Sequence, residues 1–220
     1  MQPPPPAPAG FPGLPAYAEL HCRSNFSFQV GASHAEELVA RAHALGYSAL
    51  AITDECSVAG LVRAHAEAKK LGLKLLAGSE FVLDGGDGRF RLIALAHNLN
   101  GWGALCEFIT AGRRAAPKGE YRLGWSDVTA ERLPDCELIL APDRLSRSAI
   151  TLEALCDRAT LGRRQFGSNF WLAAELLHGL DDDLWLTLLE EASAMTSVPL
   201  VAAGDVVMHV RSRKVLHDVL

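Results

Sequence analysis

The sequence lacks the features that mark membrane, secreted and nucleic-acid-coating proteins. No uninterrupted apolar run approaches the ~20 residues that cross a bilayer, and the N-terminus has neither a basic start nor an apolar signal core. The five cysteines are odd in number and scattered, with no Cys-x-x-Cys pair to indicate zinc or redox chemistry. A formal net charge of −5 argues against a module that grips nucleic acid through its whole surface. We therefore expect a cytoplasmic protein with free thiols and no membrane contact.

What the composition does contain is typical of a folded globular domain. The chain has 220 residues, of which 49% are hydrophobic and 21% charged, which is enough to bury a sizeable core. Prolines crowd the start of the chain, including the run Pro3 to Pro6, and such a run neither joins a sheet nor continues a helix. We expect residues 1–16 to form a disordered tail and residues 17–220 to form one domain.

Basic residues gather in three short stretches of the sequence. Taken alone, each stretch is more simply interpreted as solvated surface than as a binding site. The three groups are Arg113, Arg114, Lys118 and Arg122; Arg163 and Arg164; and Arg211, Arg213 and Lys214.

From residue 17 onward, short apolar segments alternate with amphipathic ones, a pattern typical of βα units around a largely parallel sheet. We predict strands at 17–21, 48–53, 74–83, 90–96, 137–141, 170–176 and 199–203. We predict helices at 33–45, 58–71, 102–113, 149–160 and 181–195. Ser33 followed by Glu36 is a capping box for the first helix, and Gly46 is its stop signal. The segment 84–88, rich in Gly and Asp, predicts a hairpin turn and therefore one antiparallel pair.

Four potential metal ligands occupy corresponding places in this pattern. His21, Asp54, Glu80 and Asp205 each lie at or just beyond the end of a predicted strand. The carboxyl ends of parallel strands meet at one edge of an α/β sheet, so these groups are expected to lie near one another. Each also has a simpler interpretation, because an Asp after a strand often caps the next helix and a lone His often only makes a hydrogen bond. The joint pattern favours a site.

The same segments resemble the motifs of the PHP (polymerase and histidinol phosphatase) family. Leu20 to Ser24 resembles the motif Leu-His-x-His-Ser, Ala51 to Glu55 resembles Leu-Thr-Asp-His, and Gly78 to Glu80 resembles Gly-x-Glu. The segment 199–207 is similar to the closing motif, which ends Asp-x-His, and residues 91–98 match the spacing of bacterial C-family DNA polymerases. The amino-acid sequence of segments 17–28 and 52–57 resembles that of the error-prone branch of these polymerases.

The resemblance implies an α/β fold, a distorted seven-stranded (β/α) barrel. It also implies an N-terminal domain followed, in intact polymerases, by palm, fingers and thumb, so this chain is expected to be a fragment. The full protein would act in translesion synthesis and DNA damage tolerance, would need Mg²⁺ in its polymerase region, and would contact DNA, accessory translesion proteins and the sliding clamp.

The chain departs from the family where active members carry metal-binding histidines. Arg23, Glu55, Arg91 and Val207 stand at those four positions. His209 lies two residues beyond Val207 and could return to the same side of an extended segment. His97 is a second candidate, more simply interpreted as a core or surface histidine. The remaining weak candidates, His21, Asp54, Glu80, Asp205 and His209, could hold a single hard ion, but we favour a metal-free site without catalytic residues.

Three functions remain open at this point. The first is an inactive structural and interaction module of a translesion polymerase. The second is an active metal-dependent phosphoesterase, either a 3′–5′ exonuclease or an enzyme resembling histidinol phosphatase. The third is a binder of a phosphorylated small molecule. The first interpretation predicts that Arg23, Arg91 or both lie within ion-pair distance of Asp54, Glu80 or Asp205, because a guanidinium can substitute permanently for a dication.

Overall fold

The computed structural model describes residues 15–83, 90–143 and 150–220. The chain divides into two compact units: Met1–Ser79 together with Gly204–Leu220, and Glu80–Ala203. We call these unit 1 and unit 2. The predicted hairpin turn at 84–88 and all but the last two residues of the predicted tail at 1–16 lie outside the described residues. Within the described ranges, no helix has the length and apolar character needed to cross a membrane.

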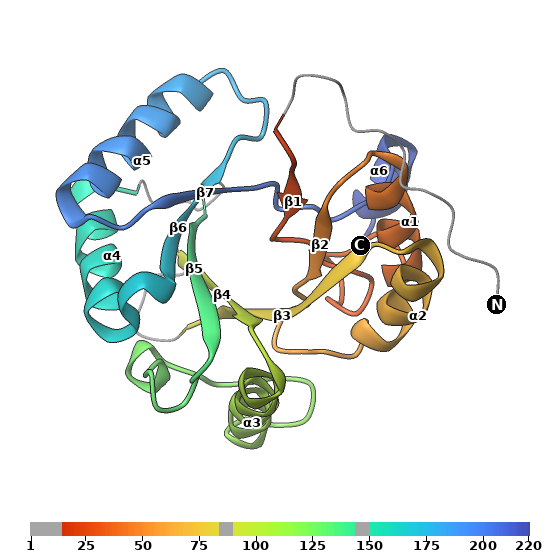
Figure 1. Ribbon diagram of the computed structural model, residues 1–220, viewed down its shortest axis with the longest axis horizontal. Helices are drawn as coiled ribbons and strands as arrows, with labels where there is room; N and C mark the ends of the chain where they lie inside the picture. Colours follow the sequence, from red (N-terminus) through yellow and green to blue (C-terminus); the bar gives the residue numbers. More distant parts are fainter. Residues whose placement is uncertain (1–14, 84–89, 144–149) are drawn as a thin grey trace. The chain divides into compact units, whose positions relative to one another are not determined.

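All seven predicted strands are present, and no strand end differs from its prediction by more than two residues. The sheet follows chain order from β1 to β7, which confirms the α/β class with seven strands and alternating helices (Figure 1). The strands are β1 (Ala18–Glu19), β2 (Ala49–Ile52), β3 (Lys74–Val82), β4 (Phe90–Ala96), β5 (Cys136–Pro142), β6 (Phe170–Glu175) and β7 (Leu200–Ala203).

Unit 1 contains a parallel arrangement in which β2 pairs with β1 on one side and β3 on the other. All four residues of β2 are buried, as expected for a strand covered on both faces. Helices α1 (Ala35–Ala44) and α2 (Leu61–Leu71) pack against each other beside β2 (Figure 1). The small residues Ala42, Ala64 and Ala68 are buried on the inner faces of these helices, which lets the helices approach closely. The unit also holds the C-terminal 3₁₀ turn Arg211–Arg213 and the short helix α6 (Lys214–His217).

Unit 2 contains an antiparallel pair, but it is not the pair of 74–83 with 90–96 that the predicted turn at 84–88 would form. β4 pairs with β5 over seven residues in register, from Phe90 opposite Pro142 to Ala96 opposite Cys136, and β5, β6 and β7 are parallel. Helices α3 (Leu99–Arg114), α4 (Leu152–Phe166) and α5 (Asp182–Thr196) complete the unit, together with the 3₁₀ turns Trp125–Asp127 and Gly167–Asn169. Phe81 and Phe108 pack edge to face in its core, with ring centroids 5.1 Å apart.

The predicted capping box at the first helix is wrong by one residue. The N-cap is His34, and the carboxylate of Glu37, not Glu36, accepts the His34 backbone N–H at 2.9 Å. The Ser33 hydroxyl, which the local pattern predicts to cap the helix, instead contacts His209 Nδ1 at 2.7 Å. A residue far along the chain therefore replaces the predicted capping interaction. The predicted stop is confirmed, because Gly46 follows the helix with φ of 74°.

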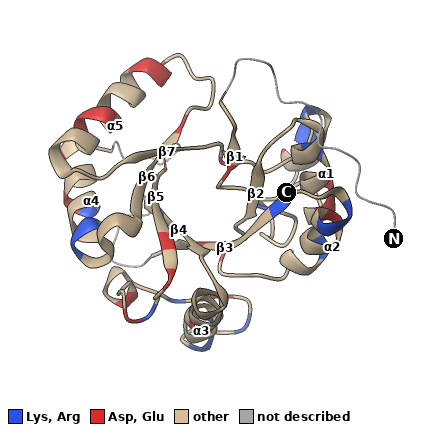
Figure 2. Ribbon diagram, in the orientation of Figure 1, with Lys and Arg blue, Asp and Glu red and all other residues tan. Residues whose placement is uncertain are grey.

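Helices α3 and α4 begin where a side-chain cap is available. α3 begins three residues before its predicted start, because the Asn98 side chain accepts the Gly101 N–H, and Thr151 does the same for α4 through the Ala154 N–H. Arg113, Arg114, Arg163 and Arg164 lie in the last turns of α3 and α4 (Figure 2), where cations favour the exposed carbonyls. Helix ends therefore account for these four arginines without a ligand.

Candidate functional site

In unit 1, the opening motif is held against the closing motif by backbone pairing. An isolated parallel bridge joins Cys22 to Val206, with the Arg23 N–H donating to the Val206 carbonyl at 2.8 Å and the Val206 N–H donating to the His21 carbonyl at 2.9 Å. Because Asp205 directly precedes Val206, this register brings its carboxylate to the side chains of His21 and Arg23.

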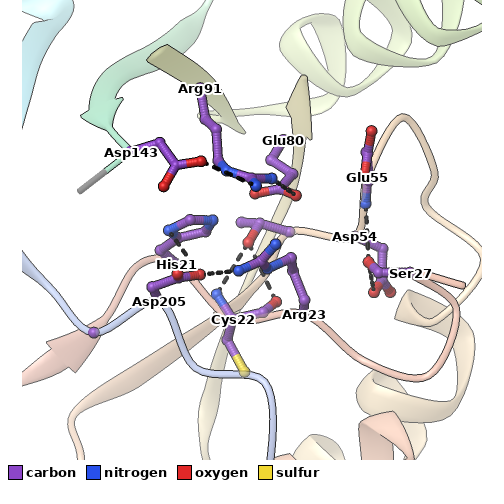
Figure 3. Close-up of polar contacts among 12 residues, drawn as sticks. His21, Cys22, Arg23, Ser27, Asp54, Glu55, Glu80, Arg91, Asp143 and Asp205 are labelled. Carbon is purple, nitrogen blue, oxygen red and sulfur yellow. Dashed lines mark hydrogen bonds and ion pairs between the residues drawn. The ribbon is translucent and has the colours of Figure 1, made fainter. Parts of the chain in front are cut away.

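Arg23 forms an ion pair with Asp205 (Figure 3). The Arg23 guanidinium also donates a hydrogen bond to Asp205 Oδ1, and His21 Nδ1 lies 3.7 Å from the same oxygen. His21 and Arg23 are buried, whereas the Asp205 side chain is partly exposed. Asp205 has a φ of 47°, a left-handed conformation uncommon outside glycine, so its position is fixed by the surrounding structure. The predicted pairing of Arg23 with one of the acids is confirmed.

Asp54 is fully buried and its carboxylate receives three protein donors. Oδ1 accepts the Ser24 backbone N–H at 2.7 Å and the Ser27 hydroxyl at 2.8 Å, while Oδ2 accepts the Ser24 hydroxyl at 2.7 Å. Such charge-assisted bonds are strong, and here they fix the loop that follows β1. Glu55 enters the same network through its backbone N–H, which donates to the Ser27 hydroxyl at 3.0 Å (Figure 3).

Glu19 is a buried acid that the sequence reasoning missed. Its carboxylate accepts the backbone N–H groups of His21 and Gly204, both at 2.9 Å, and the Tyr17 hydroxyl at 2.9 Å. Burial raises the pKa of Glu19 above its ordinary value, although these three donors and His21 oppose the shift. The available signal was its place two residues before His21, on the strand that delivers the motif.

The structure places His209 and Val207 against the start of α1. The Val207 carbonyl accepts the Ala32 N–H at 2.8 Å, the His209 N–H donates to the Ser33 hydroxyl at 3.0 Å, and His209 Nδ1 lies 3.7 Å from a Glu37 oxygen. The contacts of the His209 side chain therefore run to Ser33 and Glu37.

In unit 2, Arg91 stands between two carboxylates. Arg91 Nη1 donates to Glu80 Oε1 at 3.1 Å, and Arg91 Nη2 lies 3.6 Å from Asp143 Oδ2 (Figure 3). The Glu80 side chain is fully buried, so the guanidinium supplies charge where water does not reach. The predicted pairing of Arg91 with an acid is confirmed. Asp143 was missed, although it follows β5 directly and so meets the criterion that singled out Asp54. His97 lies apart from this group, mostly exposed, with Nδ1 3.7 Å from Glu137.

The donors present do not fit a metal centre of the kind that the family motifs imply. Asp205 is paired with Arg23, Glu80 is paired with Arg91, and the Asp54 oxygens accept three hydrogen bonds from protein groups. A dication would have to compete with fixed cations and displace these donors. Across residues 15–83, 90–143 and 150–220, no three His, Cys, Asp or Glu side chains are grouped to bind a metal ion.

Comparison with known proteins identifies relatives with the same motifs. Residues 19–160 match the model of the PHP domain family. The chain is 49% identical over 97% of its length to an error-prone DNA polymerase of Ralstonia nicotianae, and 47% identical over 94% of its length to one of Bordetella parapertussis. It spans about a fifth of the length of these relatives, 21% and 20% respectively.

Solved structures share the fold at low sequence identity. A protein of Bifidobacterium adolescentis assigned as a metal-dependent phosphoesterase matches with a TM-score of 0.64, 15% identity and coverage of 90% of this chain and 89% of that one. An amidohydrolase of Chromobacterium violaceum, with bound sulfate and no metal, matches with a TM-score of 0.66, 16% identity and coverage of 88% of each chain. On the family match and the shared fold, this chain belongs to the PHP domain family.

Proposed function

We propose that the chain is the N-terminal PHP domain of an error-prone C-family DNA polymerase that acts in translesion synthesis and DNA damage tolerance. Support comes from relatives named error-prone DNA polymerase, which are 47% to 49% identical over nearly the whole chain. The intact protein would be a cytoplasmic DNA-directed DNA polymerase that takes part in DNA repair and replication. Its polymerase region would use Mg²⁺ and bind DNA, and its partners would include accessory translesion proteins and the sliding clamp.

We further propose that the domain itself is a structural and interaction module without hydrolytic activity. One observation carries this proposal: arginines occupy two positions where the family has metal-binding histidines. Each is paired with an acid at a family metal-ligand position, Arg23 with Asp205 and Arg91 with Glu80. Catalysis by a multinuclear site requires open coordination positions and a metal-bound water. A guanidinium supplies positive charge, but it has no open coordination position and binds no metal-activated water. It can therefore neutralise the acids, but it cannot catalyse hydrolysis.

The alternative is an active metal-dependent phosphoesterase, with which the fold shared with the Bifidobacterium adolescentis protein is consistent. The two proposals differ in a measurable way. The 220-residue chain is purified without chelator, its metal content is measured, and it is assayed with Mn²⁺, Zn²⁺ and Mg²⁺ on single-stranded DNA and a chromogenic phosphate ester. We expect no stoichiometric metal and no turnover. Turnover that disappears in Asp54→Asn and Glu80→Gln would establish the phosphoesterase instead.

A further inference from the structure

A basic surface lies in unit 2, at the end of α3 and along the loop that follows it (Figure 2). Residues 113–122 hold four cations and one acid, Glu120, a local formal charge of +3 in a chain whose net charge is −5. We call the four cations the α3 basic patch; they are Arg113, Arg114, Lys118 and Arg122. The helix end accounts for the two arginines of its last turn, but Lys118 and Arg122 lie beyond the helix. Helix electrostatics therefore leaves the two loop cations unexplained.

The loop that carries the patch is fixed to the body of the unit. The Arg122 N–H donates to the Gly112 carbonyl at 3.0 Å, and the Tyr121 hydroxyl accepts the Val82 backbone N–H at 2.8 Å. The next residue, Leu123, is buried, and a Cβ at Gly112 would lie only 2.7 Å from its Cγ. Backbone pairing and close packing thus hold the loop in place, so its charges need little further ordering when they bind a ligand.

The aromatic side chain of the loop is already engaged within the protein. Arg113 Cζ lies 5.4 Å from the centroid of the Tyr121 ring, and Arg113 Nη1 lies 3.4 Å from the carbonyl oxygens of both Gly119 and Glu120. The Tyr121 hydroxyl is used by the Val82 N–H. Nucleic-acid bases are recognised by stacking on aromatic rings or by hydrogen bonds to their edges. Tyr121 is committed to Arg113 and Val82, so the patch offers charge and not base recognition.

Arg114 and Lys118 carry the charge that the protein leaves uncompensated. Both side chains are exposed, and neither has an acidic partner within residues 15–83, 90–143 and 150–220. The third basic group differs in this respect, because Lys214 Nζ lies 2.6 Å from Asp218 Oδ1. Exposed cations on a fixed surface attract a polyanion, and each phosphate that they contact releases a condensed counterion.

We propose that the α3 basic patch binds the phosphate backbone of DNA without reading the base sequence. The choice of DNA among polyanions rests on the proposed function, since the relatives are named error-prone DNA polymerase. Four cations contact at most about four phosphates, which gives weak and strongly salt-dependent binding. In the intact protein such a contact adds to those of the polymerase region on the same DNA molecule.

Fluorescence anisotropy with a labelled duplex of about 20 base pairs tests the proposal in the 220-residue chain at about 50 mM salt. The test variant is Arg114→Gln with Lys118→Gln. The matched control is Lys69→Gln with Lys74→Gln, which also removes two exposed cations that have no acidic partner among the described residues. We expect the test variant to bind the duplex at least about tenfold more weakly and to lower the salt slope of log K by about 2. The control should bind within about twofold of the unsubstituted chain.

A charge-retaining variant, Arg114→Lys with Lys118→Arg, should bind like the unsubstituted chain, which separates loss of charge from disturbance of the loop. Absence of binding by the unsubstituted chain, or equal weakening in the test and control variants, would overturn the proposal. An oligoglutamate peptide that competes as well as unlabelled duplex would identify an acidic protein segment as the partner and would overturn it too. Primer extension by the full-length polymerase reports the polymerase function separately, so failure of the patch and failure of the proposed function are distinguishable.

Discussion

The carboxylate of Asp54 accepts the backbone N–H of Ser24 at 2.7 Å, across a separation of thirty residues in the chain. The Ser24 side chain makes a second bond to the same carboxylate, also at 2.7 Å. An acid at a family metal position thus organises the loop after β1, because a buried carboxylate needs several donors and Ser24 and Ser27 provide them.

We predict that Asp54→Asn lowers the free energy of unfolding by about 2 kcal/mol, because hydrogen bonds to a charged group are replaced by neutral ones. Urea unfolding of the 220-residue chain measures the change. Asp157→Asn, on the exposed side of α4, is the control and should change stability by less than about 0.5 kcal/mol. Equal effects of the two variants would show that the Asp54 network does not contribute to stability.

Two glycines are predicted to respond to the same substitution with opposite signs. A Cβ at Gly31 would overlap the Ser24 carbonyl oxygen, so Gly31→Ala must shift backbone and should cost about 3 kcal/mol. A Cβ at Gly103, inside α3, meets nothing within 4 Å, so Gly103→Ala should stabilise the chain by about 1 kcal/mol through helix propensity. Thermal unfolding monitored by circular dichroism measures both. A loss of stability in Gly103→Ala, or none in Gly31→Ala, contradicts these local geometries.

Cys136 is predicted to stay protonated well above neutral pH. Burial, and then the charges of Asp135 and Glu137, raise the pKa of this thiol from 9.0 to about 11, and its Sγ lies 3.6 Å from the Gly101 carbonyl oxygen as a donor. At pH 8 the folded chain should therefore hold about 100-fold less thiolate at Cys136 than a thiol of ordinary pKa.

Iodoacetamide labelling with peptide mass spectrometry checks this pKa through its pH dependence. The alkylation rate of Cys136 should keep rising about tenfold per pH unit from pH 8 to 10, whereas the same cysteine in the urea-unfolded chain should level off near pH 9. Because the pKa of Cys136 is higher in the folded chain than in the unfolded chain, the free energy of unfolding should fall as pH rises above the unfolded pKa. A plateau near pH 9 in the folded chain would be incompatible with the raised pKa.

The sequence allowed the strands to be predicted closely because apolar runs and their polar ends are local features. The first helix start could not be predicted correctly, because the Ser33 hydroxyl is used by His209, 176 residues away. Asp143 could have been found, since it follows a predicted strand, but it lies outside the motifs that drew attention to the other acids. The place of Glu19 two residues before His21 was a signal, but its role could not be predicted, because it depends on the distant Gly204, whose position no local pattern predicts.

The pairing of the arginines followed from a physical argument and not from a pattern. Acids grouped at strand ends repel one another unless a cation intervenes, and histidine positions replaced by arginine supply one. The structure confirms an acid partner for Arg23 and for Arg91. Which acid each arginine selects was beyond sequence reasoning, because it depends on the register that places Asp205 beside the opening motif.

Arg91 is predicted to stabilise the fold by compensating the charge of the buried Glu80 beside it. Removal of the guanidinium in Arg91→Met leaves the Glu80 charge buried without its cation, which should lower the free energy of unfolding by about 3 kcal/mol. Glu80→Gln added to Arg91→Met removes the stranded charge, so the double variant should be more stable than Arg91→Met alone. Arg63→Met is the control: Arg63 lies 3.6 Å from Glu36 with both side chains exposed to solvent, and its loss should cost less than about 0.5 kcal/mol. Urea unfolding of the four proteins at pH 7 gives the comparison. If Arg91→Met costs no more than Arg63→Met, the guanidinium is not the compensating cation of this site and does not take the place of a metal ion there.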